Sequence, residues 1–103
     1  MLASNVAIAG SVHGVGSVKN AYFHSKESVI YPAWKGTLQL EIDSLAWNIE
    51  TDCNTQYVGV RENDTHIISA VLAAKMSGSP ITVYANEDLK VTGSFCYVRA
   101  VGL

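Results

Sequence analysis

Apolar and polar residues alternate strictly over residues 37–43. A period of two places the apolar side chains of this segment on one face of a strand and its polar side chains on the other, solvated face. Asp43-Ser44 is a turn signal, after which residues 46–50 resume the alternation with Trp47 and Ile49 on the apolar side. The pattern therefore predicts two strands joined as a hairpin.

The period changes to that of a helix after a third strand, which we place at residues 56–61. Residues 62–65 supply N-cap and acidic side chains, and residues 66–77 follow without proline or glycine. Gly78 suits the position just past a helix, and Pro80 cannot continue one. Because this helix is apolar nearly all round, we expect it to be buried on more than one side.

One apolar stripe of the predicted helix is the candidate subunit interface, and it consists of Ile67, Val71 and Ala74. The adjacent stripe, which contains Leu72, would then pack on the sheet. A small domain offers only one sheet to cover a helix, so the second side needs another partner. We therefore expect a homo-oligomer.

The C-terminal part of the chain predicts two further strands. Residues 80–85 are rich in β-branched side chains, which favour a strand, and residues 86–90 have the composition of a turn. Residues 91–103 then form a long final strand with a bulge at Gly93.

The first 35 residues carry weaker signals. Residues 6–13 have the composition of a strand, but Gly10, Gly14 and Gly16 indicate bends or bulges. Aromatic and polar residues mix over residues 20–35, which we interpret as one strand or a packed arm. The whole chain, residues 1–103, is then one domain in which residues 1–35 form an N-terminal strand or arm and residues 36–103 form the barrel core.

The order of elements from residue 36 onward is strand, strand, strand, helix, strand, strand. A helix between the third and fourth strands of a five-stranded barrel is the arrangement of the OB-fold. We therefore predict a mainly β domain with one helix (α+β). Its architecture is an OB-like antiparallel barrel of five to seven strands.

The helix and the strand after it also carry a resemblance. Residues 67–84 have an apolar helix rich in Leu and Ala, a Gly78-Ser79-Pro80 corner and a strand ending in Tyr84. This segment resembles one found in small bacterial OB-like proteins, and residues 96–103 are similar to their terminal strand. The binding subunits of pertussis-like and subtilase-type toxins have a related segment. The resemblance covers about the last 40 residues and implies a ring-forming domain with glycan binding.

Composition narrows the classes of function. Charged residues make up 16% of the chain, well below the ~25% of an average soluble domain, so a packed core is expected. The net charge of −2 argues against a surface that neutralises nucleic-acid phosphates. No apolar run approaches the ~20 residues of a membrane helix, so we expect no membrane insertion.

Two cysteines, Cys53 and Cys96, allow one disulfide. A bridge across a loop of this length would stabilise the fold by about 4 kcal/mol, and two buried thiols are the alternative. The first ten residues lack the basic region of a secretory leader. The protein is then cytoplasmic as the sequence stands, or exported if a leader has been removed.

Residues with catalytic or metal-binding chemistry are scattered. His13, His24 and His66 lie in different segments without the spacing of a metal site, so we expect no metal and no cofactor. Glu41 and Asp43 share one strand face, which we interpret as a solvated face rather than an acid–base pair. We therefore expect no catalytic residues and no enzymatic activity.

The candidate ligand-binding residues are Tyr84, Tyr97 and Arg99. Tyr97 and Arg99 alternate onto one face of the last strand, and Tyr84 lies on the strand before it. Aromatic side chains with a few polar groups are typical of a ligand site, although burial against the arm or another subunit would use the same residues. We predict a non-enzymatic binding or assembly module of unknown ligand. The alternatives are a glycan- or small-molecule-binding subunit and, with less support from the charge, a single-stranded nucleic-acid binder.

Overall fold

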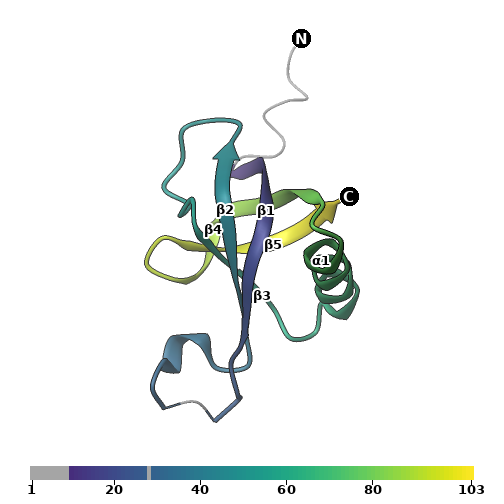
Figure 1. Cartoon of the computed structure of the whole chain (residues 1–103). Coiled ribbons are helices and arrows are strands. Elements are labelled where there is room, and N and C mark those ends of the chain that lie inside the picture. The colour runs from purple at the N-terminus through teal and green to yellow at the C-terminus, as the bar shows by residue number, and fades with distance from the viewer. Residues whose placement is uncertain (1–9, 28) are drawn as a thin grey trace.

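The computed structural model describes residues 10–27 and 29–103 (Figure 1). Its elements follow in the order β1 (Ser11–Phe23), the 3-10 helix η2 (Pro32–Trp34), β2 (Leu38–Trp47), β3 (Tyr57–Val60), α1 (Thr65–Ser77), β4 (Pro80–Thr92) and β5 (Phe95–Gly102). The strands close into a barrel in the order β1-β2-β3-β5-β4. Among the strands that the structure describes, only β3 and β5 pair in parallel. This is an OB-like α+β barrel with its helix between the third and fourth strands, as the order of elements predicts.

The hydrophobic core fills the barrel and continues under α1. Alternate residues of the strands point inward, among them the fully buried Leu40, Val58, Ile81 and Val98. The helix contacts β1, β4 and β5, and Gly78 ends it in the left-handed conformation at φ 73°. Glycine adopts this conformation without the steric penalty that a Cβ would bring, so the predicted helix stop is confirmed.

The interface predicted on α1 is wrong. Ile67, Val71 and Ala74 are 5%, 0% and 3% exposed because they pack into the core of their own chain. The outer side of the helix carries Leu72, which is only partly buried, and Met76, which is exposed. Periodicity shows that two apolar stripes lie side by side on a helix, but it does not show which one faces the sheet.

The predicted hairpin at Asp43-Ser44 is also wrong, because β2 runs through this point as one strand. Opposite it, the register of β1 shifts between Val15 and Ser17, and Ser44 has a φ of 55°. The turn signal therefore marks a bulge. Gly16 of β1 sits against this bulge, where a Cβ would come within 2.5 Å of the Ile42 side chain. Ile49, predicted to point inward, is exposed in the loop after β2.

Three other boundaries differ from those predicted. Residues 86–90 continue β4, and the turn falls instead at Gly93, where φ is 54°. The first strand is continuous from Ser11 to Phe23. Its pairing with β2 shifts register between Val15 and Ser17, so the irregularity expected from the glycines is present but does not interrupt the strand. Part of the segment expected as a strand or arm at residues 20–35 therefore belongs to β1. The strand-like stretch at residues 6–9 lies outside the described residues.

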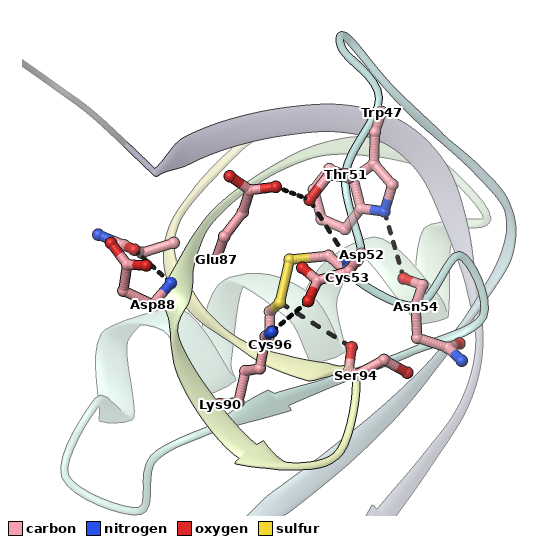
Figure 2. Close-up of a disulfide and its surroundings, with 11 residues drawn as sticks. Trp47, Thr51, Asp52, Cys53, Asn54, Glu87, Asp88, Lys90, Ser94 and Cys96 are labelled. Carbon is pink, nitrogen blue, oxygen red and sulfur yellow. Dashed lines mark hydrogen bonds and ion pairs between the residues drawn. A yellow bond between two sulfur atoms is a disulfide. The ribbon is translucent and has the colours of Figure 1, made fainter. Parts of the chain in front are cut away.

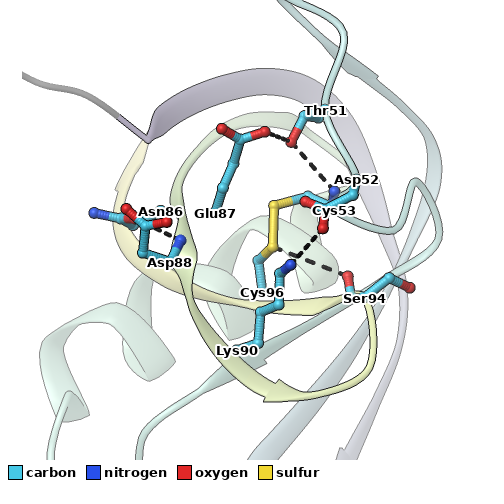
Figure 3. A network of polar contacts seen from close by, with 9 residues as sticks. All are labelled: Thr51, Asp52, Cys53, Asn86, Glu87, Asp88, Lys90, Ser94 and Cys96. Atoms are coloured by element: carbon cyan, nitrogen blue, oxygen red, sulfur yellow. Dashed lines mark hydrogen bonds and ion pairs between the residues drawn. A yellow bond between two sulfur atoms is a disulfide. The ribbon is translucent and has the colours of Figure 1, made fainter.

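A disulfide joins Cys53 to Cys96 and so ties the loop of residues 48–56 to β5 (Figure 2). At the end of β2 the Trp47 indole Nε1–H donates to the carbonyl of Asn54 in this loop over 3.2 Å. Lys90 pairs with Asp52, and the Thr51 hydroxyl donates to the Glu87 carboxylate (Figure 3). The loop after β2 is thus held by one covalent bond and several polar contacts.

Candidate ligand-binding site

A pocket of about 430 Å³ opens on the outer face of the barrel. It lies where β1, β2, β3 and β5 meet the loop of residues 24–37. Its lining is mostly aromatic and consists of Tyr22, His24, Tyr31, Trp34, Gln39, Tyr57 and Phe95. Among the described residues that line it there is no lysine and no arginine. We call it the aromatic pocket.

The loop of residues 24–37 is built on an extension of the β1–β2 pairing. The His24 N–H donates to the Thr37 carbonyl and the Gly36 N–H to the Ser25 carbonyl, each over 3.2 Å. These bonds satisfy backbone groups at the base of the loop. The loop therefore leaves the barrel from a fixed base, and η2 then turns Trp34 back onto the barrel.

Trp34 fits where it does because Gly59 lies beneath it. A Cβ at Gly59 would come within 3.3 Å of the indole Cζ3 and 2.5 Å of a Val91 methyl group. A glycine in the middle of a strand is often the mark of such a close approach. The indole is buried as a result and lines the aromatic pocket.

The rings of the aromatic pocket contact one another in sequence. Trp34 and Phe95 have ring centroids 5.5 Å apart, and Phe95 meets Tyr57 edge-on at 6.1 Å. On the other side of Trp34, His24 lies at 5.8 Å and in turn meets Tyr31 at 5.9 Å. These spacings are those of favourable aromatic pairs. The rings therefore support one another across the pocket.

The polar groups of the aromatic pocket are few and already oriented. His24 Nε2 and Gln39 Oε1 are 2.8 Å apart, which is a hydrogen bond in which the imidazole N–H donates to the amide oxygen. This bond leaves the Gln39 NH2 group as a donor. The pair therefore offers directed polar atoms beside apolar ring faces, which is the usual composition of a small-ligand site.

Beside the pocket lies a buried carboxylate, Glu41, surrounded by donors. Its oxygens accept hydrogen bonds from Asn20 at 2.9 Å, Gln56 at 3.1 Å and the Tyr22 hydroxyl at 3.4 Å, and Lys19 lies 3.8 Å away. The Asn20 and Gln56 hydrogen bonds hold the pKa of Glu41 below its usual value. Burial and the charge of Glu41 raise the pKa of Tyr22, so this hydroxyl stays protonated and donates at neutral pH.

The interpretation of Glu41 as part of a solvated face is therefore wrong, although its neighbour Asp43 is exposed. The reason is the pairing of β2 with the strands on both sides. Asn20 of β1 lies directly opposite Glu41, and Gln56, which precedes β3, reaches Glu41 from the other side. A strand considered by itself gives no sign of such neighbours.

The structure separates the three residues predicted to bind ligand. Tyr84 is exposed on β4 and its ring lies 5.5 Å from that of His13, away from the aromatic pocket. Tyr97 carries the Arg61 guanidinium 4.6 Å above its ring. Arg99 lines a different, smaller hollow beside α1 with His66.

A bulge in β5 explains why Tyr97 and Arg99 do not act together. Val98 pairs with Ala85 and Ala100 pairs with Tyr84, so Arg99 is the extra residue between two ladder pairs. Alternation breaks at such a residue. Ala100, expected on an apolar inner face, is accordingly exposed, and Val101 packs on the core instead.

Most residues of the aromatic pocket were not singled out from the sequence. The available signal was the density of aromatic residues over residues 22–34, which exceeds what an arm needs for packing. Counting residues 11–23 as the first strand would have placed Tyr22 at its end, and Tyr31 and Trp34 in the loop between the first two strands. In OB-folds that loop, with the face of the second and third strands, is where oligosaccharides and oligonucleotides bind.

Other chemical groupings are limited. In the described part of the chain no group of three or more His, Cys, Asp or Glu side chains is arranged to hold a metal ion. Within the same residues, no helix is both long enough and apolar enough to cross a membrane.

The fold and the pocket together define the class of protein. It is an OB-like barrel with an aromatic pocket on the face where OB-folds bind ligands. Neither a scan against protein-family models nor searches of curated proteins and of solved structures find a match for the chain.

Proposed function

We propose that this protein is a non-enzymatic binding module that holds a glycan in the aromatic pocket. The observation that carries the proposal is the composition of the pocket: ring faces beside one oriented His24–Gln39 pair, with no cation among the lining residues described. Sugars present apolar C–H faces and hydroxyl edges, which match ring faces and amide groups. The position on the ligand face of an OB-like barrel supports the same conclusion.

A binding role is favoured over catalysis by the state of Glu41. A general acid or base needs a pKa near the working pH and free access to the proton that it transfers. The pKa of Glu41 is lowered instead, and its oxygens already accept three hydrogen bonds. We infer that Glu41 positions Tyr22 at the rim of the pocket.

The alternative is an OB-type binder of single-stranded nucleic acid, and the stacked rings are the observation that favours it. Such binders track the phosphate backbone with a positively charged groove. The aromatic pocket lacks a cation among its described lining residues, and Lys19, beside Glu41, is paired with that carboxylate. A neutral glycan therefore fits the pocket better.

Assembly and location extend the proposal. The Cys53–Cys96 bridge is typical of oxidising compartments, so it favours the exported alternative.

A homo-oligomer stays a prediction, and it needs a contact surface other than the side of α1 that faces the core. The solution mass from light scattering tests it, and a monomer at micromolar concentration would contradict it.

The test of the proposed function is a titration with neutral saccharides (glucose, galactose, N-acetylglucosamine and their trisaccharides) followed by NMR. The indole signal of Trp34 should move on binding, whereas that of Trp47, beside the disulfide, should not. Gln39→Ala should weaken binding by about tenfold, since a ligand polar group loses its partner. Tyr84→Ala, on β4, is the matched control and should bind normally.

Two results would contradict the proposal. One is a Trp34 signal that no saccharide in the panel moves. The other is an oligonucleotide that binds with an affinity falling steeply as salt is raised, which would identify the nucleic-acid alternative.

A further inference from the structure

A second hollow lies next to the aromatic pocket, and its lining is polar and charged. It has a volume of about 240 Å³. Its charged lining residues are Lys35, Arg61 and Glu62, and the ring of Tyr97 also lines it. We call it the cationic hollow, because two of these three charged side chains are cations. The aromatic pocket, in contrast, has no cation among its described lining residues, so the two sites offer a ligand different chemistry.

The cationic hollow continues the aromatic pocket along the outer face of the barrel. Phe95 lines the pocket, and Tyr97, two residues further along the same face of β5, lines the hollow. Two residues of a strand span about 7 Å. On the loop side, Trp34 lines the pocket and the next residue, Lys35, lines the hollow. A linear ligand is therefore able to occupy both.

Arg61 is held in the hollow by an aromatic ring. It follows the end of β3, and its guanidinium carbon lies 4.6 Å from the centre of the Tyr97 ring. This is a cation–π contact, and it leaves the guanidinium N–H groups as donors. Their fork matches two oxygens of one anion better than a lysine ammonium does. Arg61 is therefore suited to bind a carboxylate or a sulfate.

The cations of the hollow are not used by the fold. The ion pairs between described residues are Lys19–Glu41, Lys26–Glu62 and Lys90–Asp52. Neither Lys35 nor Arg61 belongs to one of them. Glu62 opposes these two cations, but Lys26 lies 3.5 Å from its carboxylate and offsets that charge. The hollow therefore keeps an excess of positive charge in a chain whose net charge is −2.

We propose that the cationic hollow binds the acidic group of a glycan whose neighbouring sugar lies in the aromatic pocket. Arg61 binds two oxygens of the acidic group, a carboxylate or a sulfate ester, and Lys35 adds a second positive charge. The ligand is then an oligosaccharide in which a neutral sugar is next to an acidic one. This inference rests on the proposed function, because it adds a second subsite to the same site.

A single acidic group fits this arrangement better than a chain of phosphates. Proteins that bind single-stranded nucleic acid present cations along the whole path of the strand. Here the two ends of β3 differ in charge. Arg61 follows its end, whereas Glu41, paired with Lys19, lies opposite Tyr57 at its start. Positive charge is therefore available on one side of the aromatic pocket and is offset on the other.

The experiment compares each neutral trisaccharide with a counterpart that carries one acidic group. In the counterpart, C6 of one terminal sugar is either oxidised to a carboxylate or sulfated, and both ends of the trisaccharide are tried. The NMR signal of Trp34 measures the affinity. An acidic form should bind about fivefold more tightly, since two partly solvated ion pairs are added. This gain should shrink as salt is raised.

Four variants locate the gain. Arg61→Gln should bring the acidic and neutral affinities together, and Lys35→Gln should lower the gain in part. Glu62→Gln should enlarge it, because the opposing carboxylate is removed. Arg99→Gln is the matched control, since it removes the same charge from the hollow beside α1 and should leave the gain unchanged. All four side chains are exposed, so the variants should fold, which circular dichroism checks.

The outcomes separate this inference from the proposed function. If neutral trisaccharides move the Trp34 signal and acidic ones bind no more tightly, the cationic hollow is not a subsite, although the proposed function stands. A gain that Arg99→Gln removes as fully as Arg61→Gln does would also overturn the inference, because overall charge would then explain it. Oligonucleotide binding that is lost in Arg61→Gln would assign the hollow to phosphates instead. A Trp34 signal that no saccharide moves, neutral or acidic, contradicts both proposals.

Discussion

The loops at the two ends of β2 are held in different ways. The loop of residues 48–56, after β2, is tied by the Cys53–Cys96 bridge and by the Asp52–Lys90 ion pair (Figure 2). The loop of residues 24–37, before β2, has no covalent tie and depends on the packing of Trp34 and on backbone bonds at its base. One loop is fastened to the barrel, and the other lines a pocket and exposes apolar side chains.

This difference separates the loop that is tied to the barrel from the loop that lines the candidate site. A chain of 103 residues buries a limited core, and disulfides commonly supplement such cores in exported proteins. Because the disulfide ties the loop of residues 48–56 to the barrel, the loop of residues 24–37 is able to expose aromatic rings that would otherwise be buried in the core. Binding residues on loops carried by a rigid scaffold are a general arrangement.

The largest effect should come from removing the covalent tie. Cys53→Ser combined with Cys96→Ser should lower the free energy of unfolding by about 4 kcal/mol, because the unfolded chain gains the entropy of an open loop. Urea unfolding measures it. The matched control is Val29→Ser, Ile30→Ser in the other loop, which should stay within about 0.5 kcal/mol of wild type. Equal urea midpoints for the double-serine variant and wild type would show that the polar contacts alone hold this loop.

A somewhat smaller effect should come from the buried ring of the other loop. Trp34→Ala removes the indole packed on Phe95 and Gly59 and should lower the free energy of unfolding by about 3 kcal/mol. Tyr31→Ala, in the same loop but exposed, should cost less than about 1 kcal/mol. The same urea unfolding distinguishes them. Similar losses for both variants would mean that the loop is held by its whole aromatic cluster rather than by Trp34.

The fold was largely predictable because its strongest signal is local. The helix and its stop at Gly78 follow from composition and spacing, and the order of elements then indicates an OB-like barrel. The strand boundaries were less predictable. Asp43-Ser44 has the composition of a turn, and the same composition suits the bulge that the structure shows, so one strand was counted as two while β1 was undercounted.

The aromatic pocket could not be predicted in the same way. Its residues come from β1, β2, β3, β5 and the loop of residues 24–37, and the pairing of β3 with the distant β5 brings them together. The alternation of side chains along the last strand predicted that Arg99 shares a face with Tyr97. A bulge at Arg99 makes that prediction wrong. The resemblance of the C-terminal segment to toxin-binding subunits stays a prediction.

The smallest effect should come from the polar cluster beside the aromatic pocket, and its sign depends on pH. Hydrogen bonds from Asn20 and Gln56 lower the pKa of Glu41 in the folded state. The ionised carboxylate therefore stabilises the fold above its unfolded pKa of about 4.3. This contribution is lost as the pH falls through the lower, folded value.

Glu41→Gln should accordingly be less stable than wild type at pH 7, and the difference should shrink at pH 3, where wild type is also losing its charge. Urea midpoints at pH 7, 5 and 3 measure it. Asp43→Asn, at an exposed carboxylate on the same strand, is the control and should change little at any pH. A difference of equal size at pH 7 and pH 3 would mean that the shape of the side chain matters and its charge does not. A difference that shrinks with acid would show instead that the charge of Glu41 stabilises the face beside the aromatic pocket. The loop at the other end of β2 is stabilised by the Cys53–Cys96 disulfide, which acid leaves intact.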